Sequence, residues 1–157
     1  MGDRSGDADV RRKWEKLNSD GAAAALAGNY SKSVTLLQRA LDVCFDPLRP
    51  DYMQAERGAT LTNLAFTDAR GVHRSRLGLA SAIRKVLLDF ESAVDALVKA
   101  HGANHPAVRK ARNLAADEIE RLAGEAMAEG ARSSEEWERE KYERLAEQCR
   151  SQVAAWR

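Results

Sequence analysis

The residues that could carry chemistry are few, and the histidines come first. The chain has three of them, His73, His101 and His105, and the last two stand four positions apart. In a helix that spacing would place both imidazoles on one face, where they could bind Zn²⁺. Residues 102–104 (Gly-Ala-Asn) break such a helix. We therefore expect no metal site and no cofactor.

Other reactive groups are also isolated. Cys44 and Cys149 lie far apart among apolar helical positions, which predicts core packing rather than a disulfide or a metal site. The sequence has no glycine-rich loop to hold phosphate and no nucleophile elbow. Glutamates over residues 135–147 alternate with Arg and Lys, as on a solvated helix face. These patterns predict a protein that is not an enzyme.

Charge is distributed unevenly along the chain. The net formal charge is only +1, but residues 69–112 carry +6 and residues 113–157 carry −4. A basic centre would attract an acidic partner segment, although ordinary solvated helix surfaces would account for the same numbers. Nucleic acid is a weaker candidate, because no aromatic residues are interleaved with the basic ones and the pI is about 7.8.

Helices must position these residues. Alanine, the best helix former, supplies 28 of the 157 residues, and β-branched residues are scarce, which predicts an all-α fold. The longest apolar run, residues 22–27, is far below the roughly 20 residues that cross a bilayer. Polar residues 1–9 resemble no signal peptide and are predicted to form a disordered tail. We expect a cytoplasmic protein without membrane contact.

Apolar residues recur every three or four positions after that tail and predict six helices in one domain over residues 10–157. Glycines and prolines set their ends, and Ser133-x-x-Glu136 predicts a capping box at the start of the last helix. Short loops make neighbouring helices antiparallel. The expected pairs cover about 10–46, 51–101 and 106–157.

The first pair resembles a tetratricopeptide repeat. Gly21 stands in its first helix, Gly28-Asn29-Tyr30 at its turn, Ser33 in its second helix and Ala40-Leu41 near its end. In that family small residues let the two helices approach, and the aromatic residue fills the wedge at the turn. Asp20 departs from the pattern, since the family usually has leucine there.

The later pairs resemble the repeats of kinesin light chains. Asn63-Leu64-Ala65 recurs as Asn113-Leu114-Ala115, and residues 102–106 carry a Gly-x-x-His-Pro linker in which His105 would be structural. The two asparagines are 50 residues apart, whereas ordinary repeats run roughly 34. The excess falls on residues 71–80, which either loop out or extend the fourth helix. The resemblance implies three helix pairs stacked as a short right-handed solenoid; an alanine-rich bundle with chance matches is the alternative.

In tetratricopeptide proteins the first helix of each pair lines a concave groove. An asparagine amide there can hold a peptide backbone, and arginine can bind a carboxylate through two hydrogen bonds. Carried over to this chain, the resemblance implies a peptide-binding groove lined by Asn18, Asn63, Phe66, Arg70, Arg109, Arg112 and Asn113.

The expected function is therefore a non-catalytic scaffold or adaptor that binds an acidic segment of a protein partner. Two alternatives stay open. The chain could be a constitutive subunit of a larger assembly in which no groove is used, or a small chaperone of the tetratricopeptide type. Neither the partner nor the oligomeric state follows from the sequence.

Overall fold

A computed structural model describes residues 4–157, and the fold over this range is all-α, as predicted, with no strand. The helices pack as adjacent pairs, α1 with α2, α3 with α4 and α5 with α6. Their bounds are α1 (Arg4–Leu26), α2 (Tyr30–Val43), α3 (Gln54–Arg70), α4 (Leu79–His101), α5 (Pro106–Arg132) and α6 (Glu136–Trp156), with a 3₁₀ turn η1 (Val72–Arg74) between α3 and α4.

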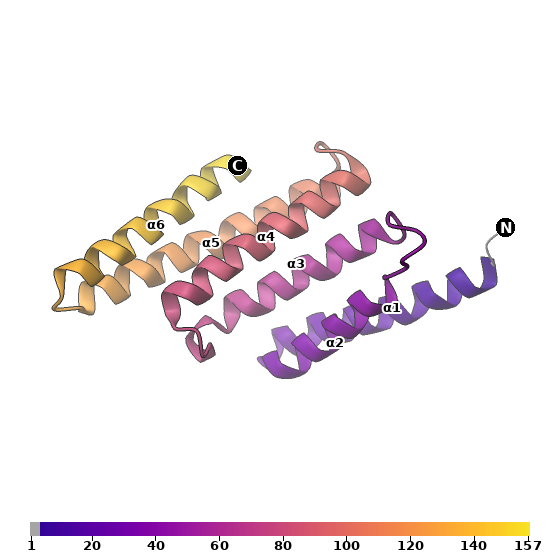
Figure 1. The fold of residues 1–157 in the computed structure, drawn as a ribbon, viewed down its shortest axis with the longest axis horizontal. Helices are drawn as coiled ribbons and strands as arrows, with labels where there is room; N and C mark the ends of the chain where they lie inside the picture. The colour runs from indigo at the N-terminus through magenta and orange to yellow at the C-terminus, as the bar shows by residue number, and fades with distance from the viewer. Residues whose placement is uncertain (1–3) are drawn as a thin grey trace.

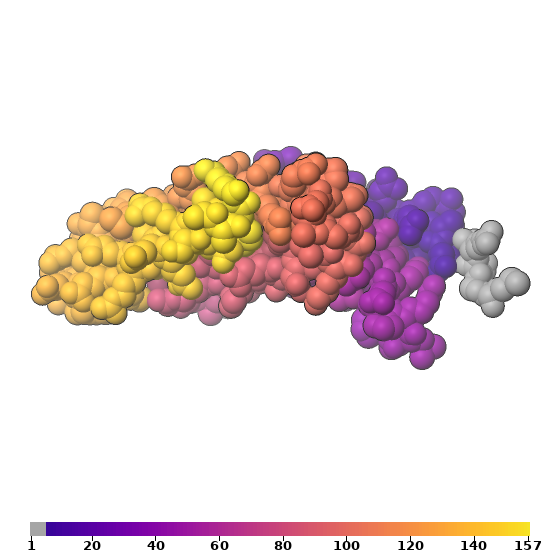
Figure 2. All heavy atoms as spheres, turned by 90° about the horizontal axis from the view of Figure 1, so that it is seen from above, coloured from indigo at the N-terminus to yellow at the C-terminus, as the bar shows by residue number. Residues whose placement is uncertain are grey.

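The three pairs stack in chain order into an elongated body (Figures 1 and 2). Each new pair rests on the one before it. Helix α3 packs against both α1 and α2, and α5 packs against both α3 and α4. Helix α6 also touches α4. The helices α1, α3 and α5 thus form one row, which is the row that the predicted groove requires.

The first helix begins earlier than predicted. Residues 4–9 belong to α1, so the expected disordered tail is wrong for them. Asp7 holds this turn, because its carboxylate accepts hydrogen bonds from the Arg49 guanidinium at 3.3 Å and from the Tyr52 hydroxyl at 3.1 Å. The bonds from Arg49 and Tyr52 lower the pKa of Asp7. Residues 1–3 of the predicted tail lie outside the described residues.

Of the segment 71–80, residues 71–78 loop out rather than extending the fourth helix, and only the last two residues belong to it. The loop contains the η1 turn, whose Val72 is buried, and α4 starts only at Leu79. The predicted capping box is also wrong. Ser133 ends α5, and its hydroxyl donates to Glu138 at 2.7 Å and accepts from the Glu135 amide at 3.1 Å. The turn between α5 and α6 places Ser133 too far before α6 to cap it.

The largest cluster of the hydrophobic core lies in the second and third pairs, although Leu37 and Ala40 of α2 are also fully buried. This main cluster draws on α3, η1, α4, α5 and α6 and surrounds Phe90 and Ile119 with alanines. Neither this cluster nor the smaller one, near Val108, includes a residue of α1 or α2. Cys44 and Cys149 are buried free thiols, which confirms their prediction as packing residues.

Two glycines let paired helices approach closely. A Cβ on Gly21 would lie 2.6 Å from Leu37 Cγ, so α1 and α2 are as close as the sequence predicted. A Cβ on Gly58 would lie 2.7 Å from Leu97 Cγ and 3.2 Å from the Leu97 amide nitrogen, which brings α3 equally close to α4. Ser33 has another role, a buried hydrogen bond of 2.9 Å to Thr67 of α3.

Gly58→Ala should destabilise the protein. Its methyl group would collide with Leu97, including backbone that cannot rotate away, and overpacking of this kind costs about 1–3 kcal/mol. Gly124→Ala is the matched control, because nothing lies within 4 Å of its Cβ position in α5. That substitution should raise the free energy of unfolding by about 0.5–1 kcal/mol. Urea unfolding followed by circular dichroism measures both; equal effects of the two substitutions would contradict close packing at Gly58.

Candidate functional site

The predicted groove residues lie along α1, α3 and α5, but they fall into three separate environments. Asn18 and Asn63 meet where α1 contacts α3. Phe66 and Arg70 lie between α3 and α5. Arg109, Arg112 and Asn113 surround a hollow at the start of α5.

At the contact of α1 with α3, polar side chains join the first pair to the second. Trp14 donates its indole N–H to Thr60 at 2.8 Å, and Thr60 donates to the amide oxygen of Asn18 at 2.9 Å. The Asn63 amide donates to the same oxygen at 3.1 Å. The two asparagines are therefore engaged with each other, and their observed role is to connect the helix pairs.

Between α3 and α5 the predicted Arg70 is also engaged. Its guanidinium donates to Glu118 at 2.6 Å and lies 5.1 Å from the centre of the Phe66 ring. Glu118 is only 4% exposed, so it needs this partner in a poorly solvated place. Arg121 is the second partner of Glu118 and donates to its carboxylate at 3.1 Å. Arg121 also donates to the Ala69 carbonyl at 2.9 Å.

This charged network extends to the connector after α3. His73 of η1 lies 3.0 Å from the Glu125 carboxylate, and Arg121 approaches the same carboxylate at 3.8 Å. The network anchors both the end of α3 and the connector to α5. Glu118 could have been noticed in the sequence, because it interrupts the apolar face that Ala115 and Ile119 form; its partners are set by tertiary contacts.

The hollow at the start of α5 brings three predicted residues together. Arg109, Arg112 and Asn113 line an open space of about 650 Å³ together with Trp156 and Arg157. Arg109 donates to the Asn104 carbonyl at 3.0 Å and Arg112 to the Ala103 carbonyl at 3.4 Å. Within residues 6–157 neither guanidinium has a carboxylate within 4 Å, whereas Arg157 is paired with Asp117 and Glu120. The Arg109 and Arg112 charges are thus available to an anionic ligand.

The histidines near this hollow are structural. His105 Nδ1 accepts a hydrogen bond of 3.1 Å from the Ala107 amide and so caps α5. Its ring stacks on His101 at 4.0 Å between centroids. In the described part of the chain, no three His, Cys, Asp or Glu side chains converge as a metal would require.

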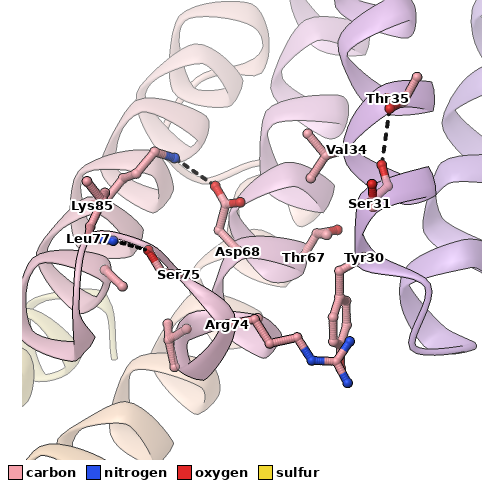
Figure 3. Close-up of a pocket in the computed structure, with 13 residues that line it drawn as sticks. Tyr30, Ser31, Val34, Thr35, Thr67, Asp68, Arg74, Ser75, Leu77 and Lys85 are labelled. Atoms are coloured by element: carbon pink, nitrogen blue, oxygen red, sulfur yellow. Dashed lines mark hydrogen bonds and ion pairs between the residues drawn. The ribbon is translucent and has the colours of Figure 1, made fainter.

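A second hollow, which no sequence pattern indicated, lies between α2 and the connector (Figure 3). Tyr30, Val34 and Thr35 of α2 line one side of a space of about 430 Å³, and Leu77 and Lys85 line the other. No periodic signal marks these residues, because the connector brings them together from three elements.

Lys85 forms two ion pairs beside this second hollow, and the one with Asp68 connects α4 to α3. Lys85 of α4 donates to Asp68 of α3 and to Asp89, both at 2.8 Å. Burial raises the pKa of the Asp68 carboxyl, against the opposing hydrogen bond from Lys85. Burial also lowers the pKa of Lys85, but its hydrogen bonds to both carboxylates outweigh this and raise it. The lysine therefore stays charged beside the two acids.

The chain was compared with family models, curated proteins and solved structures. No protein-family model, no curated protein and no solved structure matches it. Among residues 4–157, no helix combines the length and hydropathy of a membrane span.

Arg121→Ala should test the network around Glu118. The substitution removes one charge partner of a buried carboxylate and leaves the Ala69 carbonyl without its donor. Hydrogen bonds to charged groups contribute about 1.5–3 kcal/mol, so we expect a loss of about 2 kcal/mol in the free energy of unfolding. Arg132→Ala, which breaks only an exposed pair with Glu129, should cost less than about 0.5 kcal/mol. Similar losses in both variants would contradict a buried network.

Neither cysteine should behave as a reactive nucleophile. Burial raises the pKa of Cys44 and of Cys149 to about 11 each. Since only the thiolate attacks, a dithiobis(nitrobenzoate) reagent should label the folded protein very slowly at about pH 8, and faster as the pH approaches 11. Both thiols should react at once in denaturant. Fast labelling of the folded protein near neutral pH would contradict this burial.

Proposed function

We propose that the chain is a non-catalytic interaction scaffold of the tetratricopeptide type, which binds an acidic segment of a partner protein at the hollow formed by Arg109, Arg112, Asn113 and Trp156. The proposal keeps the predicted function and narrows the predicted groove to the third helix pair. Asn18, Asn63, Phe66 and Arg70 then support the stack instead of touching the ligand.

The observation that carries the proposal is the state of the two arginines. Arg109 and Arg112 each hold a backbone carbonyl through one nitrogen, which orients the guanidinium, and neither has a carboxylate partner among residues 6–157. An acidic side chain entering the hollow would meet two oriented cations. Asn113 is exposed beside them and could bind the peptide backbone.

The Trp156 ring suits a peptide at this place. It is half-buried against the main core, so its position is set by packing before any ligand arrives. A rigid aromatic surface beside paired cations adds contact area at little cost in conformational entropy. Two observations support the absence of catalysis in this proposal. Both thiols are buried, and the Nδ1 atom of His105 already accepts the hydrogen bond that caps α5.

A permanent place in a larger assembly is a second candidate, favoured by exposed apolar side chains. Leu48 is 89% exposed and Phe45 71%, both in the loop between α2 and α3. In that case the native chain in a cell extract would elute well above its own 17.3 kDa. Phe45→Ser with Leu48→Ser would then release it as a monomer, without changing the binding of acidic peptides.

Fluorescent peptides of about ten residues, rich in Asp and Glu and free of aromatic residues, test the proposed site. Arg109→Glu with Arg112→Glu should weaken their binding, measured by anisotropy, by about tenfold or more, because repulsion replaces two charge-assisted contacts. Binding should also weaken as salt is added.

The control is Arg144→Glu with Arg150→Glu on the exposed face of α6, which changes the net charge equally and touches no part of the hollow. It should change the affinity by less than about twofold. Equal weakening by the two pairs would show that only overall charge matters, and the proposed site would then be wrong. Circular dichroism checks that each variant is folded.

A further inference from the structure

The hollow between α2 and the connector is one end of a longer furrow. A neighbouring hollow of about 300 Å³ shares Val34, Asp68 and Lys85 with it, and Leu61 and Leu64 of α3 line its floor. The two therefore form one furrow between α2 and α4. Along α4 it reaches from Ala82 to Ser92, a length of about 15 Å.

The corresponding place in the next helix pairs is closed. Helices α4 and α6 touch directly, and Phe90 meets Trp156 edge to face with 6.4 Å between ring centres. Both helices contribute to the main core cluster, whereas α2 contributes to neither cluster. The furrow is therefore a junction between two helix pairs that no apolar side chain of a neighbouring helix fills. Leu61 and Leu64, both half-exposed, line its floor.

Three hydroxyls along the furrow are already hydrogen-bonded, whereas the side chains of Gln38 and Ser92, which also line it, have no hydrogen bond among residues 6–157. The Thr35 hydroxyl donates to the Ser31 carbonyl at 3.1 Å, and the Thr67 hydroxyl donates to the Asn63 carbonyl at 2.8 Å. The Ser75 hydroxyl already accepts from the Leu77 amide. The walls of the furrow are helices and offer no free backbone edge, so a helix, which satisfies its own backbone hydrogen bonds, suits it better than an extended strand.

Charge gives the furrow a direction. At the connector end Arg74 lies against the Tyr30 ring, 5.3 Å from its centre (Figure 3). Arg74 lines this end, and the exposed Arg76 stands between the lining residues Ser75 and Leu77; neither arginine has a carboxylate within 4 Å among residues 6–157. Further along, Lys85 is balanced by Asp68 and Asp89. Positive charge is therefore free at one end only.

We propose that this furrow binds an amphipathic helix of a partner protein, with the apolar stripe of that helix over Val34, Leu61 and Leu64 and its acidic end at Arg74 and Arg76. This site goes beyond the proposed function. It lies near the start of α4 and the α5 hollow near its end, and the 23 residues of α4 span about 34 Å. The chain can then hold two partner segments at once, which is the work of an adaptor.

A displayed library of amphipathic helices of about 18 residues tests the proposal. Leucines are fixed on one face, and every other position varies among acidic, basic and neutral residues. The full chain is the bait. Selected helices should be enriched in Asp and Glu at one end, and Arg74→Glu with Arg76→Glu should weaken their binding by about tenfold or more.

Thr35→Trp fills the furrow without touching the core, since Thr35 is exposed and lines it. It should also weaken binding by about tenfold or more, whereas Ser151→Trp on the exposed face of α6 should have no effect. Arg109→Glu with Arg112→Glu should leave the selected helices unaffected, so that this proposal and the proposed function fail separately. Selection of no helix, or of helices that bind Thr35→Trp normally, would overturn the proposal.

Discussion

The close approach of two helices within each pair is the constraint on which the rest of the structure depends. Gly21 lets Leu37 pack onto the α1 backbone, and Gly58 does the same for Leu97. Helices this close leave little room for large side chains between them, so a pair buries too little apolar surface to be stable alone. Each pair must therefore stack on a neighbour, as in other solenoid proteins. The abundant alanine that predicts helices also suits this close packing.

The stacking contacts differ along the chain, and that difference creates the surfaces. The second and third pairs share a continuous apolar core from α3 to α6. The first pair belongs to neither core cluster, and side-chain hydrogen bonds connect it to the second pair through the Trp14–Thr60–Asn18 chain and the Ser33–Thr67 bond. Such bonds fix the position of the helices without filling the space beside them. The furrow between α2 and α4 is the physical result.

Local signals predicted most of the fold, because glycines, prolines and apolar spacing act within a few residues. The stop at Gly28-Asn29 and the start at Pro106 are of this kind. Long-range partners could not be predicted. Asp7 in the first turns of α1 is bonded by Arg49, 42 residues away in the chain, and the arginines of α5 meet Trp156 only because α6 returns across them. Asn18 and Asn63 were predicted to line a groove and are hydrogen-bonded to each other, since a groove and a helix contact both favour an amide that can donate and accept.

Tertiary structure also determines how much of the positive charge in residues 69–112, the basic centre of the sequence, is available to a ligand. Three of the nine Lys and Arg residues in this centre are neutralised within the fold, where Arg70 binds Glu118, Lys85 binds two aspartates and Lys99 binds Asp95. The remaining free cations lie near the two ends of α4. Their separation of about 30 Å is several Debye lengths at physiological ionic strength, so one anionic ligand would not repel another. The two sites are connected by α4 and by α3, which lines the furrow and packs against α5, and both helices contribute to the main core cluster. Independent occupancy of both ends is therefore the behaviour that this charge arrangement favours.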